Sequence, residues 1–419
     1  MKKFLSLALA LVMLAGCVAV FASCSVDGGK KGMADSLLPA PELKTTVTVP
    51  SDFKIGFIFL HDENSTYDAN FINAAKEIKK LFNLSDDQVI MKTQVSESND
   101  CYETAKELAE AGCKIVFADS FGHEGFLAQA AAEYPNVQFC HATGVSAHTE
   151  EAPANLHNAF ASIYEGRYLA GIVAGKKLNQ MIEEGKITAD KAVMGYVGAF
   201  TYAEVISGLT SFYLGAKSVC PSVTMKVQFT GSWYDESLEQ EAANALISKG
   251  CVLISQHADS MGAPSACETA GVPNVSYNGS TYDACQDTFL VSSAINWAPY
   301  LQYIIESVVN GTPIADDWCG GIAEGSVVLS GINNNAAPEG TAEAVQTAIY
   351  GFKAGTLHVF DTSKDNFITV NGQKLTTYTL DGKEVVKDGY FHESDVTVRS
   401  APYFDVRIDG IEFLNEKFG

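Results

Sequence analysis

Polar and aromatic side chains follow several apolar runs of the chain, where buried β-strands are expected to end. Because the carboxyl ends of parallel strands meet at one edge of a sheet, these side chains are expected to line a common cleft. Aromatic rings stack on planar compounds, and carboxylates and amides hydrogen-bond the edges of such compounds. The candidate ligand-binding residues are Asp62, Tyr67, Ser120, Phe121, Phe200, Trp233, His257, Asp259, Asn278, Asn296 and Trp297.

Several of these candidates have a structural alternative. Trp233 and Trp297 can pack within or between lobes instead of stacking on a ligand. Asp62 precedes an expected helix and can serve as its cap. His257, a lone histidine after a strand, can be a hydrogen-bonded structural residue with Asp259 as its partner.

Motifs that would indicate catalysis, a cofactor or a metal are missing from the sequence. No GxSxG elbow, HExxH or GxGxxG is present. The run GIVAGKK differs from a P-loop, since only three residues separate Gly171 from Gly175 and Lys177 stands where Ser or Thr is required. No two cysteines form a CxxC pair. We therefore expect a binding protein without cofactor or metal rather than an enzyme.

The charge of the chain excludes one class of partner. With 28 basic and 50 acidic side chains, the formal net charge is -22. A surface of this kind repels nucleic acid phosphates, so nucleic acid is not an expected partner.

The first 24 residues have the pattern of a lipoprotein signal peptide. Lys2 and Lys3 precede an apolar run, 4–15, that is short for a membrane span. Cys17 follows a lipobox-like LAG, and Cys24 follows a poorer match but stands where the chain turns polar, which favours Cys24. Acylation at either cysteine predicts a protein held at the extracytoplasmic face of the cell membrane by its lipid alone.

Cysteines beyond the signal peptide raise the question of disulfides. Cys101, Cys267, Cys285 and Cys319 lie in loop-like segments, where pairing in an oxidising compartment is one alternative and free thiols are the other.

The elements that must position the candidate residues alternate between strand and helix. Residues 25–52 lack apolar periodicity and indicate a flexible linker, and the alternation starts near residue 53. It pauses at 155–177, where a buried strand leads into a helix rich in small residues, and then begins again. This order predicts two α/β lobes, each a parallel sheet covered by helices. Residues 53–161 plus 289–322 are assigned to lobe I, and residues 162–288 plus 323–419 to lobe II.

The C-terminal part of lobe II has a different composition. Four dipeptides, Asn371-Gly372, Asp381-Gly382, Asp388-Gly389 and Asp409-Gly410, separate short alternating runs. Such dipeptides favour tight turns, so β-hairpins appended to lobe II are expected.

Several segments resemble the basic membrane protein family. They include VFADSFGHEGFLAQAAAEYPNVQFCHATG, IYEGRYLAGIVAGKK and SWYDESLEQEAANALISKG, of which the runs at 167–171 and 233–235 are the most telling. These lipoproteins are similar to purine nucleoside receptor A, which serves an ABC importer. The resemblance implies a type I periplasmic-binding-protein fold, with two Rossmann-like lobes that close on a ligand about a multi-strand hinge.

The resemblance also implies a ligand and a partner. The ligand would be a purine nucleoside or nucleobase held in the inter-lobe cleft and delivered to an ABC permease. Asn278 stands where the nucleoside receptors are expected to carry an aspartate for ribose, and Asn296-Trp297 where they carry a lysine, which favours a base. The alternatives are a ligand sensor for a membrane signalling partner and a surface nucleoside hydrolase.

Overall fold

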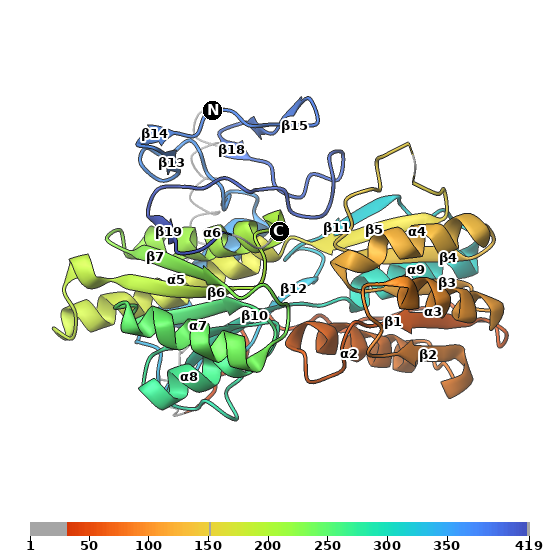
Figure 1. The fold of residues 1–419 in the computed structure, drawn as a ribbon, viewed down its shortest axis with the longest axis horizontal. Helices are drawn as coiled ribbons and strands as arrows, with labels where there is room; N and C mark the ends of the chain where they lie inside the picture. The colour runs from red at the N-terminus through yellow and green to blue at the C-terminus, as the bar shows by residue number, and fades with distance from the viewer. Residues whose placement is uncertain (1–31, 151, 417–419) are drawn as a thin grey trace, which may run out of the picture.

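Two α/β lobes lie side by side in the computed structural model, which describes residues 32–150 and 152–416 (Figure 1). Each lobe has one main sheet with helices on both faces, so the predicted fold class is confirmed. The predicted signal peptide, including Cys17 and Cys24, lies outside the described residues.

The first lobe contains a six-stranded parallel sheet in the order β11-β5-β4-β3-β1-β2. Its strands are β1 (Ile55–Ile58), β2 (Val89–Lys92), β3 (Ile115–Ala118), β4 (Gln138–Ala142), β5 (Leu156–Ala161) and β11 (Asp317–Gly320). Its helices are α2 (Thr66–Leu81), α3 (Asn99–Glu110), α4 (Glu124–Glu133) and α9 (Ala298–Asn310), with 3-10 turns η1 (Asp86–Gln88) and η2 (Phe121–His123). Phe57 packs with the residues of α2 and α9, whereas Ile58 packs with α3 and α4, so this apolar strand is buried on both faces.

The second lobe contains a seven-stranded sheet in the order β12-β10-β9-β8-β6-β7-β19. Its strands are β6 (Val193–Gly198), β7 (Thr224–Phe229), β8 (Leu253–His257), β9 (Asn274–Tyr277), β10 (Phe289–Ile295), β12 (Val327–Leu329) and β19 (Ile411–Phe413). Its helices are α5 (Ile163–Glu183), α6 (Ala203–Val219), α7 (Glu236–Ser248), α8 (Gly262–Ala270) and α10 (Thr341–Lys353), with the 3-10 turn η3 (Ala189–Lys191). Only β12 runs antiparallel to its neighbour within this sheet.

The main chain passes between the two sheets at three places. Ser162 joins β5 to α5, Asn296 and Trp297 join β10 to α9, and residues 321–326 join β11 to β12. The second crossing differs from our boundary, because Phe289–Ile295 pairs with β9 and β12 of the second lobe. The return to lobe I therefore begins at Asn296 rather than at residue 289.

Helices α5 and α6 touch through their backbones, which explains the small residues in the 155–177 stretch. A Cβ atom on Gly171 would overlap the carbonyl oxygen of Phe212, and one on Gly215 would overlap that of Tyr168. The glycines therefore allow a close approach that compensates for their low helix propensity.

The segment before β1 is packed against the body, which corrects our expectation of a linker extending to residue 52. The amide of Ala34 donates to Ile332 at 2.9 Å, and the carbonyl of Leu38 accepts from Leu329 at 2.9 Å. Farther along, Thr45 Oγ1 donates to Glu306 of α9 at 2.7 Å. The segment is extended, so its apolar side chains show no helical or strand periodicity in the sequence.

The C-terminal extension lies over the second lobe on the side of α6 and β19 (Figure 1). Three of the four predicted hairpins are present: β13 (Thr369–Val370) with β14 (Gln373–Lys374), β15 (Thr379–Leu380) with β16 (Lys383–Glu384), and β17 (Val386–Lys387) with β18 (Tyr390–Phe391). The fourth prediction is wrong. After Gly410, strand β19 pairs in parallel with β7, because the chain adds an edge strand to the main sheet instead of folding back.

All eight cysteines in the described part of the chain have free thiols, and seven of these residues are buried, so no predicted pairing is found there. Within residues 32–150 and 152–416, no helix has the length and apolar character needed to cross a membrane.

Candidate functional site

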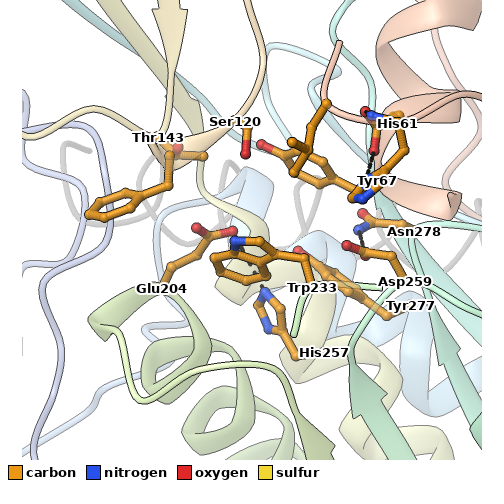
Figure 2. Close-up of a pocket in the computed structure, with 13 residues that line it drawn as sticks. His61, Tyr67, Ser120, Thr143, Glu204, Trp233, His257, Asp259, Tyr277 and Asn278 are labelled. Atoms are coloured by element: carbon orange, nitrogen blue, oxygen red, sulfur yellow. Dashed lines mark hydrogen bonds and ion pairs between the residues drawn. The ribbon is translucent and has the colours of Figure 1, made fainter. Parts of the chain in front are cut away.

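A cavity lies between the carboxyl ends of the two sheets (Figure 2). Both lobes contribute to the thirteen residues that line it. They are Leu60, His61, Tyr67, Asp68, Ser120, Phe121 and Thr143 from the first lobe, and Glu204, Trp233, His257, Asp259, Tyr277 and Asn278 from the second.

Asp68 in the first turn of α2 provides a carboxylate on the first-lobe wall. Ser65 caps this helix, and its hydroxyl donates to Asp68 Oδ2 at 2.6 Å. The amide of His61 donates to Asp68 Oδ1 at 2.7 Å. Burial raises the pKa of Asp68, but the hydrogen bonds from His61 and Ser65 lower it further than burial raises it. Asp68 is therefore ionised at neutral pH.

Tyr67 and Ser120 are held in place by neighbours in the first lobe. The Tyr67 hydroxyl donates to the carbonyl of Asp119 at 2.9 Å, and its ring packs edge-on against Phe71. Ser120 Oγ donates to Glu97 Oε1 at 2.7 Å. These bonds fix the orientation of Tyr67 at the start of α2 and of Ser120 after β3.

His257 and Tyr277, the last residues of β8 and β9, lie against each other with ring centroids 4.5 Å apart. His257 Nε2 is 3.6 Å from Glu204 Oε1 at the start of α6. Burial lowers the pKa of His257, although Glu204 opposes that change. The imidazole is therefore neutral at pH 7, and it holds the carboxylate of Glu204 beside the cavity (Figure 2).

Arg167 of α5 supports this second-lobe wall from behind. Its guanidinium is fully buried and donates to Ser255 Oγ at 2.7 Å and to the carbonyl of Ser276 at 3.2 Å. The same group lies 5.0 Å from the centre of the Tyr277 ring. Arg167 thus ties α5 to the ends of β8 and β9, which explains an arginine in the 167–171 run that the sequence singled out.

Asp259 and Asn278 form a polar pair in the cavity wall. Asn278 has a left-handed backbone with φ of 61°. Its side-chain nitrogen Nδ2 donates to Asp259 Oδ1 at 3.4 Å. Burial raises the pKa of Asp259 well above its usual value, and the charges of Glu239 and Asp68 add to this shift. Asp259 therefore remains protonated at pH values where an exposed aspartate is ionised.

A row of aromatic rings runs from the cavity toward the first lobe. Trp233 contacts Phe200 edge-on at 5.0 Å, and Phe200 stacks on Tyr202 at 5.2 Å. Tyr202 in turn stacks on Phe121 of the other lobe. Trp233 and Phe121 line the cavity itself, so the row connects the two lobes beside it.

The lobes are also joined by hydrogen bonds across the cleft. The amide of Thr66 in α2 donates to the carbonyl of Asp259 at 3.1 Å. Asn70 Nδ2, one helical turn later, donates to Asn278 Oδ1 at 3.3 Å. The structure therefore represents a closed arrangement of the two lobes.

Seven of the eleven predicted residues line the cavity: Tyr67, Ser120, Phe121, Trp233, His257, Asp259 and Asn278. Phe200 lies behind Trp233. Asp62 instead accepts from Asn64 and Gln94 on the outside. Asn296 bonds the carbonyl of Gly325 at a crossing between the lobes.

Trp297 is a core residue of the first lobe. It is 1% exposed, and its ring stacks on Phe71 with centroids 4.4 Å apart. The packing alternative is therefore correct for this tryptophan, since its ring is covered on the side of α2 rather than open to the cleft.

Six lining residues were not among the predicted set: Leu60, His61, Asp68, Thr143, Glu204 and Tyr277. His61 directly precedes Asp62, and Glu204 stands in the first turn of α6, so both occupy strand-end positions of the kind that the sequence singles out. Tyr277 is the final residue of a short strand, and Asp68 lies within a helix, where the sequence offers no comparable signal.

No Lys or Arg is among the thirteen lining residues. Within the part of the chain that the structure describes, no group of three His, Cys, Asp or Glu side chains has a geometry suited to a metal ion. The cavity therefore offers aromatic rings, hydroxyls, amides and carboxyl groups to a ligand.

The family model for PnrA-like ABC transporter substrate-binding proteins, Bmp, matches residues 58–349. The chain belongs to the Bmp family. A purine-binding protein of Brucella abortus is 30% identical over 310 residues, covering 73% of this chain and 83% of the relative. A putative ABC transporter glucose-binding protein of Haloferax volcanii is 32% identical over 247 residues, which is 59% of each chain.

Comparison of structures agrees with the fold of this Bmp-family chain. An ABC transporter solute-binding protein from Conexibacter woesei superposes with a TM-score of 0.59 at 21% identity, covering 75% of this chain and 99% of that one. This Bmp-family member is thus an extracytoplasmic substrate-binding protein of an ABC transporter, with a small-molecule ligand and a permease as partners.

Proposed function

We propose that this protein binds a purine nucleobase or nucleoside in the inter-lobe cavity, as a lipid-anchored component of an ABC importer, without converting the ligand. The observation that carries the proposal is the wall composition. Trp233, Phe121 and Tyr277 present rings, Asp259 and Asn278 present polar edges, and no cation lines the cavity. Rings suit a planar heterocycle, and a purine-binding relative at 30% identity supports this class.

Phosphorylated purines are expected to bind poorly. Phosphate recognition usually relies on Arg or Lys, and the walls instead carry Asp68 and Glu204. The side-chain amide of Asn278 bonds both Asp259 and Asn70. Because asparagine is uncharged, it lacks the charge that an aspartate would offer to ribose hydroxyls. A base is therefore the favoured ligand over a nucleoside.

The experiment that tests the proposal is mass spectrometry of the small molecules that co-purify with the protein, followed by calorimetry with bases, nucleosides and nucleotides. We expect a purine to be released on denaturation and to bind again to the stripped protein. Binding of a sugar or an amino acid while every purine fails would overturn the proposal. Chromatography of the recovered ligand should show no hydrolysis product.

The lipid anchor is tested separately. N-terminal peptide mass spectrometry of the membrane fraction should find a diacylated Cys24 or, failing that, Cys17. Unmodified cysteines at both positions would contradict the anchor while leaving the ligand proposal intact.

A further inference from the structure

The cavity walls contain three carboxyl groups and no fixed cation. Asp68, Glu204 and Asp259 come from α2, α6 and the loop after β8. The one side chain close to Glu204 with a basic group is His257, and burial keeps this imidazole neutral at pH 7. The walls therefore present an excess of hydrogen-bond acceptors and of negative charge.

The nearest buried guanidinium does not neutralise these groups. Arg167 lies behind the Tyr277 ring, and its donors are directed to Ser255, Ser276 and the Tyr196 hydroxyl at 3.3 Å. An arginine held by these oxygens cannot turn into the cavity without leaving several of them unpaired. Arg167 therefore brings no positive charge or hydrogen-bond donor into the cavity.

Polar atoms around the cavity lack partners among the described residues. Thr143 Oγ1 and Tyr277 Oη are buried without a hydrogen bond, and both residues line the cavity. Asp259 Oδ1 receives only the long contact of 3.4 Å from Asn278. Because buried polar groups are normally satisfied, these atoms mark the places where ligand groups would complete the site.

We propose that the cavity selects its planar ligand by hydrogen-bond donors, preferring heterocycles with an exocyclic amino group over those with an oxo group at the same position, with Asp259 as the accepting residue. This inference rests on the proposed function, since it concerns the same cavity. An amino N–H meeting the ionised form of Asp259 forms a charge-assisted hydrogen bond, whereas an oxo oxygen meeting that form would face a second acceptor. Only the protonated form can donate to an oxo group. The proton that Asp259 carries in the free protein would pass to solvent when the amino group binds.

The test compares two matched pairs of bases by calorimetry on the intact protein, stripped of ligand, at neutral and alkaline pH. Adenine and hypoxanthine differ by amino against oxo, as do cytosine and uracil. We expect the amino member of a pair to bind about 10- to 100-fold more tightly. The preference should grow as the pH rises through the raised pKa of Asp259, because the ionised carboxylate has no proton to donate to an oxo group.

Two variants locate the preference. Asp259→Asn keeps the shape of the side chain but replaces one acceptor oxygen by a donor, so the amino preference should disappear or reverse. Asp62→Asn makes the same change at a carboxylate that does not line the cavity, and its selectivity should equal that of the wild type. Thermal unfolding of both variants checks that neither change disturbs the fold.

The outcomes separate the two proposals. Equal binding of amino and oxo purines, or an unchanged preference in Asp259→Asn, would overturn donor selection and leave the purine proposal standing. An amino preference confined to the pyrimidine pair, with no purine bound, would support donor selection and overturn the purine proposal. Failure of all four bases would contradict both.

Discussion

The Phe121 ring of the first lobe stacks on the Tyr202 ring of the second, with centroids 4.9 Å apart and planes inclined by 29°. The two residues lie on opposite sides of the cleft, in η2 and directly before α6. An aromatic pair of this kind contributes about 0.5–1.5 kcal/mol. The contact therefore stabilises the closed arrangement, and separation of the lobes must break it.

Tyr202→Ala is expected to shift the protein toward the open state. Tyr202 is not among the residues that line the cavity, so the variant should weaken ligand binding by about two- to tenfold through closure alone. Small-angle scattering should show a larger radius of gyration for the ligand-free variant than for its saturated form. Tyr350→Ala, at a tyrosine of α10 that is 56% exposed, serves as the control and should behave as the wild type. Superimposable scattering curves with and without ligand would contradict hinge closure on binding.

Trp233→Ala and Trp297→Ala are expected to have opposite effects. Trp233 lines the cavity, so its loss should weaken purine binding by about five- to a hundredfold with little change in thermal stability. Trp297 fills the core against Phe71, so its loss should cost about 3–5 kcal/mol of unfolding free energy. Calorimetry and denaturant unfolding measure the two effects. A wild-type affinity in Trp233→Ala would assign the stacking role to another ring.

The two tryptophans show how far the sequence predicts the site. Both follow a strand, which is enough to place them near the end of a sheet. Their roles differ because different elements surround the two rings. Trp297 directly precedes α9 and is covered by α2, whereas Trp233 lies in a loop before α7. A single sequence contains no information about that covering helix.

Tertiary packing also explains the errors in our prediction of the fold. The alternation of strands and helices predicted both sheets because strands such as β1, β3 and β6 are short, apolar and followed by a helix. Residues 33–50 fall within the predicted linker, 25–52, because an extended chain that packs on helices has no periodic spacing of apolar residues. Strand β10 was placed in the wrong lobe because an apolar strand fits either sheet equally well.

Gly171→Ala is expected to destabilise the second lobe. A methyl group there would overlap the Phe212 carbonyl oxygen, so α5 and α6 must separate, at a cost of about 1–3 kcal/mol or more. Gly125→Ala is the matched control, because no atom lies within 4 Å of the added methyl in α4. The control should be neutral or gain about 0.5–1 kcal/mol from helix propensity. Equal thermal stability of the two variants would disprove the close approach of the helices.

Adenine affinity is expected to rise with pH. Free Asp259 keeps its proton to a pH well above the usual range because it is buried and faces Glu239, Asp68 and Glu204. The complex binds fewer protons than the free protein, so affinity increases as pH rises through the raised pKa and becomes constant above it.

Calorimetry in buffers of different ionisation enthalpy should show proton release on adenine binding. Burial raises the pKa of Glu239 to about 7, so this group can also exchange a proton near neutral pH. Asp259→Asn separates the two contributions, since only the part due to Asp259 should be lost. An unchanged pH profile in that variant would show that Asp259 does not exchange its proton on binding.

The packed segment before β1 contacts both lobes. Gly32, the first residue that the structure describes, bonds Asn334 and Asn335 of the second lobe. Seven residue steps, from Leu38 to Thr45, then span to α9 of the first lobe, and an extended chain of that length reaches about 25 Å. A lipid anchor at the N-terminus would therefore hold the second lobe stationary. Ligand capture would then be a rotation of the first lobe, limited by the length of the segment from Leu38 to Thr45.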